Sequence, residues 1–236
     1  MNTKKIPSVE QWLAVSTSGP LWTVYLGPRQ GEGQQVELQA PRGHARDLLG
    51  SIEDLLATAG LQLSDLAGLA VDVGPGSFTS LRMGLATVRA LAWACDRPVA
   101  TSTSLAALAA QADARDQQVF SLVPARRGWW YVGQGHGARV AEVAVVADAE
   151  LAAWVAERKS NQAVAVGAWS AALLESLSLT AAATAAQPTA AWVAKSAGEP
   201  GPALAVMPAY LAASEAEIAK GWFAPDLAIE ASDRRI

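Results

Sequence analysis

The sequence predicts an α/β protein, because apolar runs typical of buried strands alternate with segments of helical periodicity. The clearest unit spans residues 66–95, where the apolar run Leu69–Val73 leads into the turn Gly74-Pro75-Gly76 and then into a helix that ends near Cys95. Leucine and isoleucine recur at steps of three and four residues over 44–59, which predicts a second long helix.

The other elements follow from shorter patterns. Branched and aromatic runs bounded by glycine, proline or hydroxyl-rich turns predict strands, and caps followed by periodic apolar residues predict helices. The expected strands are 12–15, 21–26, 34–39, 99–101, 119–123, 129–132, 140–146 and 163–167, and the expected further helices are 105–112, 148–158 and 190–197.

A polar, charged stretch at 113–118 marks the expected boundary between two lobes. We expect an amino-terminal lobe over 1–112 and a second, smaller lobe over 113–202. The carboxy-terminal segment 203–236 is expected to pack back on the first lobe.

Composition narrows the classes of function. The net charge of −4 argues against this chain alone holding RNA by its phosphates. Its single cysteine, Cys95, cannot form an internal disulfide, and with two histidines far apart no histidine-based metal motif is visible. No secretory signal and no run long enough to span a membrane is seen, so we expect a cytoplasmic protein.

The turn at 74–76 has the features of an anion site. Ser77 and Thr79 follow it and can accept hydrogen bonds from the unpaired N–H groups at the start of the helix, whose dipole also favours an anion. A tight strand-to-helix connection without a ligand explains the spacing equally well. The pattern is neither a Walker loop nor a dinucleotide fingerprint.

The same residues carry a family resemblance. Gly74-Pro75-Gly76-Ser77-Phe78-Thr79, followed by Leu81-Arg82-Met83-Gly84-Leu85-Ala86-Thr87, resembles the signature of the TsaB (YeaZ) family, although Ser80 stands where the family usually has Gly. The resemblance implies a two-lobed actin/Hsp70/sugar-kinase-like (ribonuclease H-like) fold, in which each lobe is a mixed sheet with packed helices.

The turn at 16–18 resembles the Asp-Thr-Ser turn of that fold, where phosphate can lie. The candidate phosphate or nucleotide residues are therefore Ser16, Thr17, Ser18, Gly74, Gly76, Ser77 and Thr79. Ser16 replaces the Asp that organises metal and phosphate in catalytic relatives, and ordinary turn chemistry is the favoured explanation of this stretch. Acidic residues are also missing at Pro124 and Ala168.

The resemblance implies that the two long helices form a shared interface, in which such a protein pairs with itself or with its catalytic relative TsaD. Along the helix near 79–95, Leu81, Leu85, Val88 and Ala92 form one stripe, and Arg82, Ala86, Arg89 and Trp93 form another; one of them must cover the sheet. Packing of Trp93 on the chain's own second lobe is the alternative. The candidate interface residues are Leu48, Ile52, Leu81, Arg82, Leu85, Ala86, Arg89 and Trp93.

A second hairpin, at 119–132, carries Arg126 and Arg127 next to Trp129, Trp130 and Tyr131. Cations interleaved with aromatic rings can bind single-stranded RNA. An ordinary hairpin whose aromatics cover a small sheet is the favoured interpretation, because an isolated basic pair in an acidic chain is weak support for an RNA surface.

One function leads, and three alternatives stand beside it. The resemblance implies a non-catalytic accessory subunit that binds and activates a TsaD-like catalytic subunit, which transfers threonylcarbamoyl to adenosine 37 of tRNA. It also implies a homodimer when that partner is absent, a possible TsaE-like ATPase partner, and only indirect contact with tRNA. No catalytic residue, cofactor or metal is expected in this chain. The alternatives are a small nucleotide-dependent phosphotransferase or ATPase of the same fold, a divergent paralogue with another binding role and, remotely, a peptidase.

Overall fold

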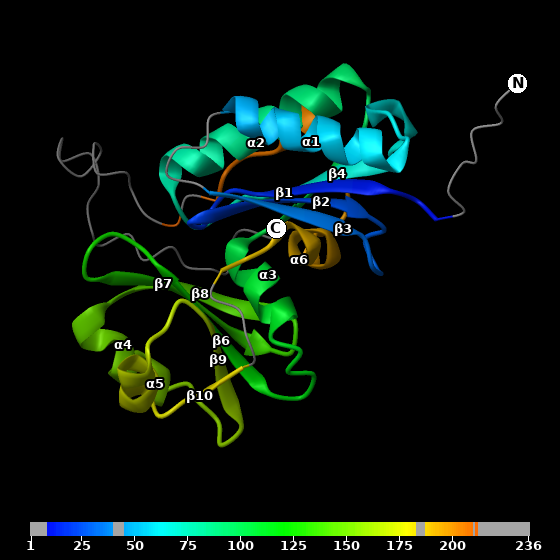
Figure 1. Ribbon diagram of the computed structural model, residues 1–236. Coiled ribbons are helices and arrows are strands. Elements are labelled where there is room, and N and C mark those ends of the chain that lie inside the picture. Colours follow the sequence, from blue (N-terminus) through cyan, green and yellow to red (C-terminus); the bar gives the residue numbers. More distant parts are fainter. Residues whose placement is uncertain (1–8, 40–44, 183–186, 210, 212–236) are drawn as a thin grey trace, which may run out of the picture.

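The computed structural model describes residues 9–39, 45–182, 187–209 and 211. They form two five-stranded mixed sheets with helices packed on both faces (Figure 1), in the actin/sugar-kinase-like fold expected from the resemblance. The predicted positions of the elements are confirmed to within a few residues, except that α5 (Ala171–Leu177) and the short β10 (Thr180–Ala181) were not predicted.

The first sheet has the order β3-β2-β1-β4-β5. β1 pairs antiparallel with β2 and parallel with β4, because a hairpin joins the first two strands whereas helix α1 lies between β3 and β4 in the chain. The strands are β1 (Trp12–Ser16), β2 (Leu21–Gly27), β3 (Gln34–Gln39), β4 (Gly68–Asp72) and β5 (Val99–Ser102).

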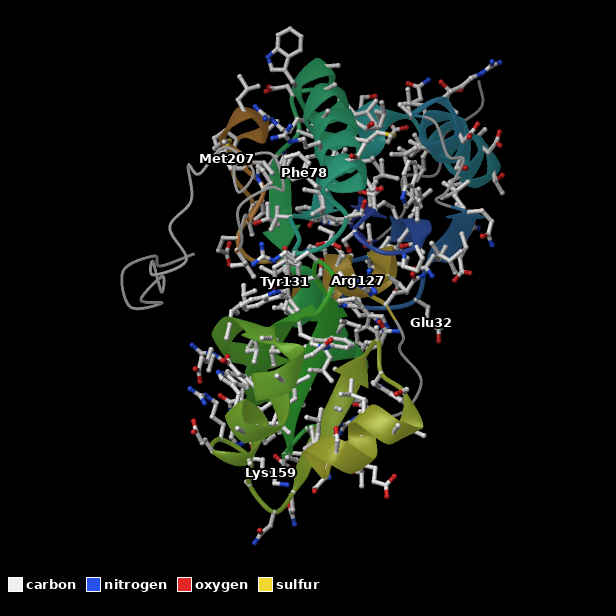
Figure 2. All side chains as sticks on the ribbon, turned by 90° about the vertical axis from the view of Figure 1, so that its left-hand side faces the viewer. Glu32, Phe78, Arg127, Tyr131, Lys159 and Met207 are labelled. Carbon is white, nitrogen blue, oxygen red and sulfur yellow. The ribbon has the colours of Figure 1, made fainter. Side chains whose placement is uncertain are left out.

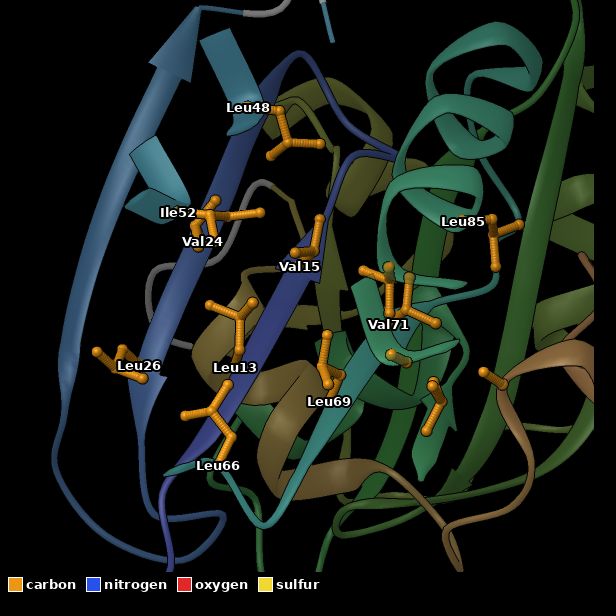
Figure 3. Close-up of a cluster of buried hydrophobic side chains, with 14 of the residues drawn as sticks. Leu13, Val15, Val24, Leu26, Leu48, Ile52, Leu66, Leu69, Val71 and Leu85 are labelled. Atoms are coloured by element: carbon orange, nitrogen blue, oxygen red, sulfur yellow. The ribbon is translucent and has the colours of Figure 1, made fainter. Parts of the chain in front are cut away.

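Two helices, α1 (Ala45–Ala59) and α2 (Phe78–Ala94), lie side by side on one face of this sheet (Figure 1). Alternate residues of β1 point to opposite faces, so Leu13 and Val15 pack under these helices. Figure 3 shows both residues together with Leu48 and Ile52 of α1 and Leu85 of α2. This cluster is the larger core of the first lobe.

The opposite face of the first sheet is covered by α6 (Ala190–Ser196), which contacts β1, β2, β4 and β5. Ala14 and Ala70 on the strands and Ala190 and Ala194 on the helix are fully buried there, and their small side chains allow close approach. α6 lies within the range 113–202 that the sequence assigned to the second lobe, although it packs on the first sheet. The division into 1–112 and 113–202 stays a prediction, and this contact argues for a different boundary.

The second sheet has the order β10-β9-β6-β7-β8, which repeats the strand pattern of the first. Helix α3 (Ser104–Gln111) covers one face, where it also contacts α6, so that α3 and α6 lie between the two sheets (Figure 1). Helices α4 (Asp148–Ala156) and α5 cover the other face. The strands are β6 (Gln118–Pro124), β7 (Trp129–His136), β8 (Arg139–Ala147), β9 (Ala163–Gly167) and β10.

The described part of the carboxy-terminal segment runs along the first lobe. Gly201 forms an antiparallel bridge with Val99 of β5, the short 3-10 helix η3 (Ala203–Ala205) contacts α2, and the Ala209 N–H donates to the Val73 carbonyl at 2.8 Å. Most of the remainder of 203–236 lies outside the described residues.

Candidate functional site

The chain bends after β1, and residues 16–18, called the bend below, are buried although turns usually lie at the surface. Ser16 and Thr17 are almost without solvent exposure, and Ser18 is also buried. The hydroxyls of Ser16 and Ser18 donate to Oδ2 of Asp72, at 2.9 Å and 2.5 Å. Two side chains proposed as phosphate ligands are therefore already bonded to an acceptor within the chain.

Asp72 is the centre of this polar cluster. It ends β4 directly beside the end of β1, and its other oxygen, Oδ1, accepts from the Gly74 N–H and the Ser104 hydroxyl, both at 2.8 Å. An ionised carboxylate offers about four acceptor positions. The four donors thus match what this side chain can accept, although it is 1% exposed.

Two physical effects act on the ionisation of Asp72 in opposite directions. Burial removes water from the carboxylate and raises the pKa of Asp72 above its ordinary value. The hydrogen bonds from Ser18, Gly74, Ser104 and Ser16 act to lower that pKa, and burial is the larger effect.

The carboxylate that position 16 lacks is therefore supplied by the neighbouring strand. Asp72 and Ser104 are not among the site residues predicted from the sequence, where the only feature noted was Ser16 in place of an Asp. A signal was present, because Asp72 is a charged residue at the end of an otherwise apolar buried run. Only the parallel pairing of β1 with β4 shows that positions 16 and 72 share one site.

The two stretches proposed to hold phosphate are brought together, but they pack directly on each other. The Ser77 N–H donates to the Ser18 carbonyl at 2.9 Å, and the Thr17 hydroxyl donates to the Ser80 carbonyl at 2.8 Å. A Cβ on Gly76 would lie 2.5 Å from the Ser18 carbonyl oxygen. This contact occupies the space between the bend and the turn, so the geometry does not favour the nucleotide-enzyme alternative.

The prediction that the Ser77 side chain accepts a hydrogen bond at the start of α2 is wrong. Ser77 is the residue before α2, but its side chain accepts no hydrogen bond from the helix. Its hydroxyl donates instead to the hydroxyl of Ser80 at 3.0 Å. Ser77 and Thr79 are exposed, and their part in binding a ligand stays a prediction.

The structure separates the two stripes of α2 and corrects half of the interface set. The side chains of Leu48, Ile52, Leu81 and Leu85 are 0%, 2%, 4% and 4% exposed. Leu48, Ile52 and Leu85 belong to the core beneath the two helices (Figure 3), and Leu81 is buried beside Gly74. These leucine and isoleucine side chains face the chain's own interior, because the apolar stripe of each helix must cover the sheet. They cannot offer contacts to a partner in this conformation.

The other stripe of α2 faces outward. Arg82 and Ala86 are exposed, Arg89 is half-buried, and Trp93 is 70% exposed. The alternative that Trp93 packs on the second lobe is therefore wrong. Arg82 stacks over the Phe78 ring at 3.9 Å, and an Arg89 guanidinium nitrogen donates to the Leu204 carbonyl at 3.3 Å.

Five of the six large apolar side chains that are exposed in the described residues lie on α1, on α2 or on the carboxy-terminal segment that runs beside α2. Phe78 and Trp93 on α2, Leu49 on α1, and Leu204 and Met207 beside α2 are between 38% and 70% exposed. Figure 2 shows Phe78 on α2 and Met207 on the neighbouring carboxy-terminal segment. A concentration of exposed apolar side chains on one side of a lobe is typical of a protein–protein contact surface.

The aromatic hairpin of the second lobe is engaged within the chain. The Arg126 guanidinium lies 4.9 Å from the centre of the Trp129 ring, and the Trp130 indole N–H donates to Asp148. Burial raises the pKa of Tyr131, with a smaller opposite effect from Arg126. Figure 2 shows Arg127 and Tyr131 near the junction of the lobes. These contacts agree with the favoured interpretation of a structural hairpin.

Comparison with known proteins places these features in a family. A family model described as TsaD, tRNA N6-adenosine threonylcarbamoyltransferase, matches residues 36–159, which is more than half of the chain. The chain belongs to this family, as a TsaB (YeaZ) member. The tRNA threonylcarbamoyladenosine biosynthesis proteins TsaB of Haemophilus influenzae and Escherichia coli are 36% and 31% identical to it, over 52% and 50% of this chain.

The similarity in sequence covers about half of each chain, whereas the similarity in structure covers more. Each of those alignments covers 52% of the relative, so the chain spans about half the length of the curated relatives it matches. The solved structure of YeaZ from Pseudomonas aeruginosa matches 86% of this chain and all of its own length, with a TM-score of 0.67 and 27% identity. The TsaB (YeaZ) fold therefore extends across both lobes.

Two further findings concern the described residues only. Over 9–39, 45–182, 187–209 and 211, no group of three or more His, Cys, Asp or Glu side chains could hold a metal ion. Within the same ranges, no helix has both the length and the apolarity needed to cross a membrane.

Proposed function

We propose that this chain is a non-catalytic accessory subunit that binds a TsaD-like catalytic subunit in the synthesis of tRNA threonylcarbamoyladenosine. The observation that carries the proposal is the outward stripe of α2, with Ala86 and Trp93 exposed and Leu49, Leu204 and Met207 beside it. The TsaB relatives are named as tRNA threonylcarbamoyladenosine biosynthesis proteins, which supports the assignment to this process. The packed contact between the bend and the glycine turn supports a role in docking rather than in nucleotide chemistry.

We further propose that two copies pair through the same helices when the partner is absent. α2 carries Arg82 and Arg89 and no acidic residue, whereas α1 exposes three acidic residues and one basic residue, which are Asp47, Glu53, Asp54 and Arg46. In a two-fold symmetric contact, α1 of each copy can lie against α2 of the other, which brings opposite charges together twice. This charge pattern is what supports the homodimer.

The test is binding of the TsaD-like protein of the same organism to the wild-type chain and to two matched variants. Ala86→Arg places a long charged side chain in the outward stripe, and Ala152→Arg places the same side chain on exposed α4 of the second lobe. We expect Ala86→Arg to weaken binding by about 100-fold or more and Ala152→Arg to leave it unchanged. Light scattering gives the mass of each complex.

Formation of threonylcarbamoyladenosine by the mixture provides the second measurement. We expect the wild-type chain to support the modification and Ala86→Arg to lose that support while the isolated variant keeps its circular dichroism and its unfolding transition. Unchanged binding by folded Ala86→Arg would exclude the outward stripe as the contact surface. Absence of any complex with the wild-type chain would point to a divergent paralogue with another role.

A further inference from the structure

The Asp72 carboxylate joins segments that are far apart in the sequence. Its two oxygens accept from Ser16 and Ser18 in the bend after β1, from the Gly74 N–H in the glycine turn, and from Ser104 at the start of α3. Each of these groups is buried. α3 in turn packs on the second sheet, so the cluster lies where the first lobe meets the helix that leads to the second.

The bend that Asp72 holds is also the support for the first turns of α2. The Ser18 carbonyl accepts from the Ser77 N–H at 2.9 Å, and the Thr17 hydroxyl bonds the Ser80 carbonyl at 2.8 Å. One helical turn further on, a Cβ on Gly84 would lie 2.3 Å from the Thr17 hydroxyl oxygen. Thus α2 rests on Thr17 and Ser18 without intervening side chains, and any shift of the bend moves the start of α2.

We propose that Asp72 is the positioning residue of α2: a single buried carboxylate between the ends of β1 and β4 fixes the bend, and through the bend it sets the place of the outward stripe. The part that concerns partner binding rests on the proposed function. The part that concerns the placement of α2 stands on the contacts within this chain alone.

The geometry also implies that the carboxylate can come from either strand, but not from both. Positions 16 and 72 are neighbours at the ends of paired parallel strands, and the Ser16 hydroxyl lies 2.9 Å from Oδ2 of Asp72. A carboxylate on residue 16 would therefore enter the space that Oδ2 now fills. Two carboxylates in this buried site would repel each other. A site without any carboxylate would leave the buried donors without an acceptor.

The experiment is a double-mutant cycle of Asp72→Ser and Ser16→Asp in the full chain. Gln118→Ala is the control, because Gln118 is a buried polar residue whose side chain donates to the Arg158 carbonyl and accepts from the Ser160 N–H, both in the second lobe. Hydrogen exchange of the Ser77 and Leu81 amides reports on the start of α2, since both are hydrogen bonded there. Amides of β8 serve as the internal reference, and affinity for the TsaD-like partner is measured in parallel.

We expect each single variant to speed exchange at Ser77 and Leu81 by about tenfold or more and to weaken partner binding by a similar factor. The double variant should return both measurements to within about threefold of wild type, because one carboxylate is restored to the site. Gln118→Ala should leave the start of α2 unchanged. If positions 16 and 72 acted independently of each other, the losses measured for the two single variants would instead add in the double variant.

The proposal is overturned if Asp72→Ser folds and exchanges as the wild type does, or if the double variant is as impaired as the sum of the single ones. Should Asp72→Ser fail to fold, the double variant decides: recovery of the fold supports the inference and continued failure rejects it. If the wild-type chain does not bind the TsaD-like protein, the proposed function fails, while the exchange measurements still decide the role of Asp72.

Discussion

The substitution Gly84→Ala tests the contact between the bend and α2 most directly. Gly84 is buried in the middle of α2, where alanine is normally the better helix former. A Cβ at this position would lie 2.3 Å from Oγ1, 3.1 Å from Cγ2 and 3.2 Å from Cβ of Thr17. The Thr17 side chain would have to move, and its hydrogen bond to the Ser80 carbonyl would be lost.

The expected change in the free energy of unfolding is the balance of three terms. Helix propensity favours alanine over glycine by about 1 kcal/mol. Forcing extra volume into a packed contact costs about 1–3 kcal/mol, and a lost hydrogen bond costs about 1 kcal/mol. We therefore expect Gly84→Ala to destabilise the chain by about 1–3 kcal/mol, against the trend of helix propensity.

Urea unfolding followed by circular dichroism measures this change. Gly50→Ala in α1 is the matched control, because nothing lies within 4 Å of the Cβ that it would add, and it should stabilise the chain by about 0.5–1 kcal/mol. In a Thr17→Ala background, Gly84→Ala should be close to neutral. If Gly84→Ala stabilises the wild-type chain as much as Gly50→Ala does, α2 does not rest on Thr17 and the reasoning is refuted.

Three further outcomes are expected. Leu48→Ala should destabilise the chain by about 2–5 kcal/mol, because Leu48 is buried. Leu49→Ala, at the neighbouring position that is 38% exposed, should change the stability by about 0.5 kcal/mol. Equal effects of the two substitutions in chemical unfolding would contradict the assigned helix face. The Arg29 guanidinium caps the end of α6 by donating to the Ala194, Ala197 and Gly198 carbonyls. Arg29→Ala should therefore lower the unfolding free energy by about 2 kcal/mol. An unchanged midpoint of urea unfolding would argue against a stabilising role of this cap. Burial raises the folded-state pKa of Asp72, so the contribution of this residue to stability is fully present below the unfolded pKa of about 3.9 and is lost as pH rises through the higher folded pKa. The stability of the wild type relative to Asp72→Asn should therefore fall from about pH 4 upward. A relative stability that grows with pH would show that the hydrogen bonds to the ionised carboxylate dominate.

Local patterns predicted most of the secondary structure. The apolar and aromatic runs of β1 and β2, the periodicity of α1 and the strand-turn-helix unit around Gly74-Pro75-Gly76 are each visible in residues close in the chain. α5 and β10 were missed, because a helix of seven residues and a strand of two residues carry too short a pattern to detect.

The residues alone are enough to predict an α/β chain with a family signature and to group the side chains of α2 into two stripes. The sequence has one limit here. It could not decide which stripe is the core, because both carry apolar residues and only packing on β1 and β4 separates Leu85 from Ala86. Likewise, it could not place Asp72 beside Ser16 and Ser104, since these residues meet only after β4 pairs with β1 and β5. Periodicity fixes the direction of a side chain relative to its own element, whereas contacts between elements distant in the chain depend on the tertiary structure.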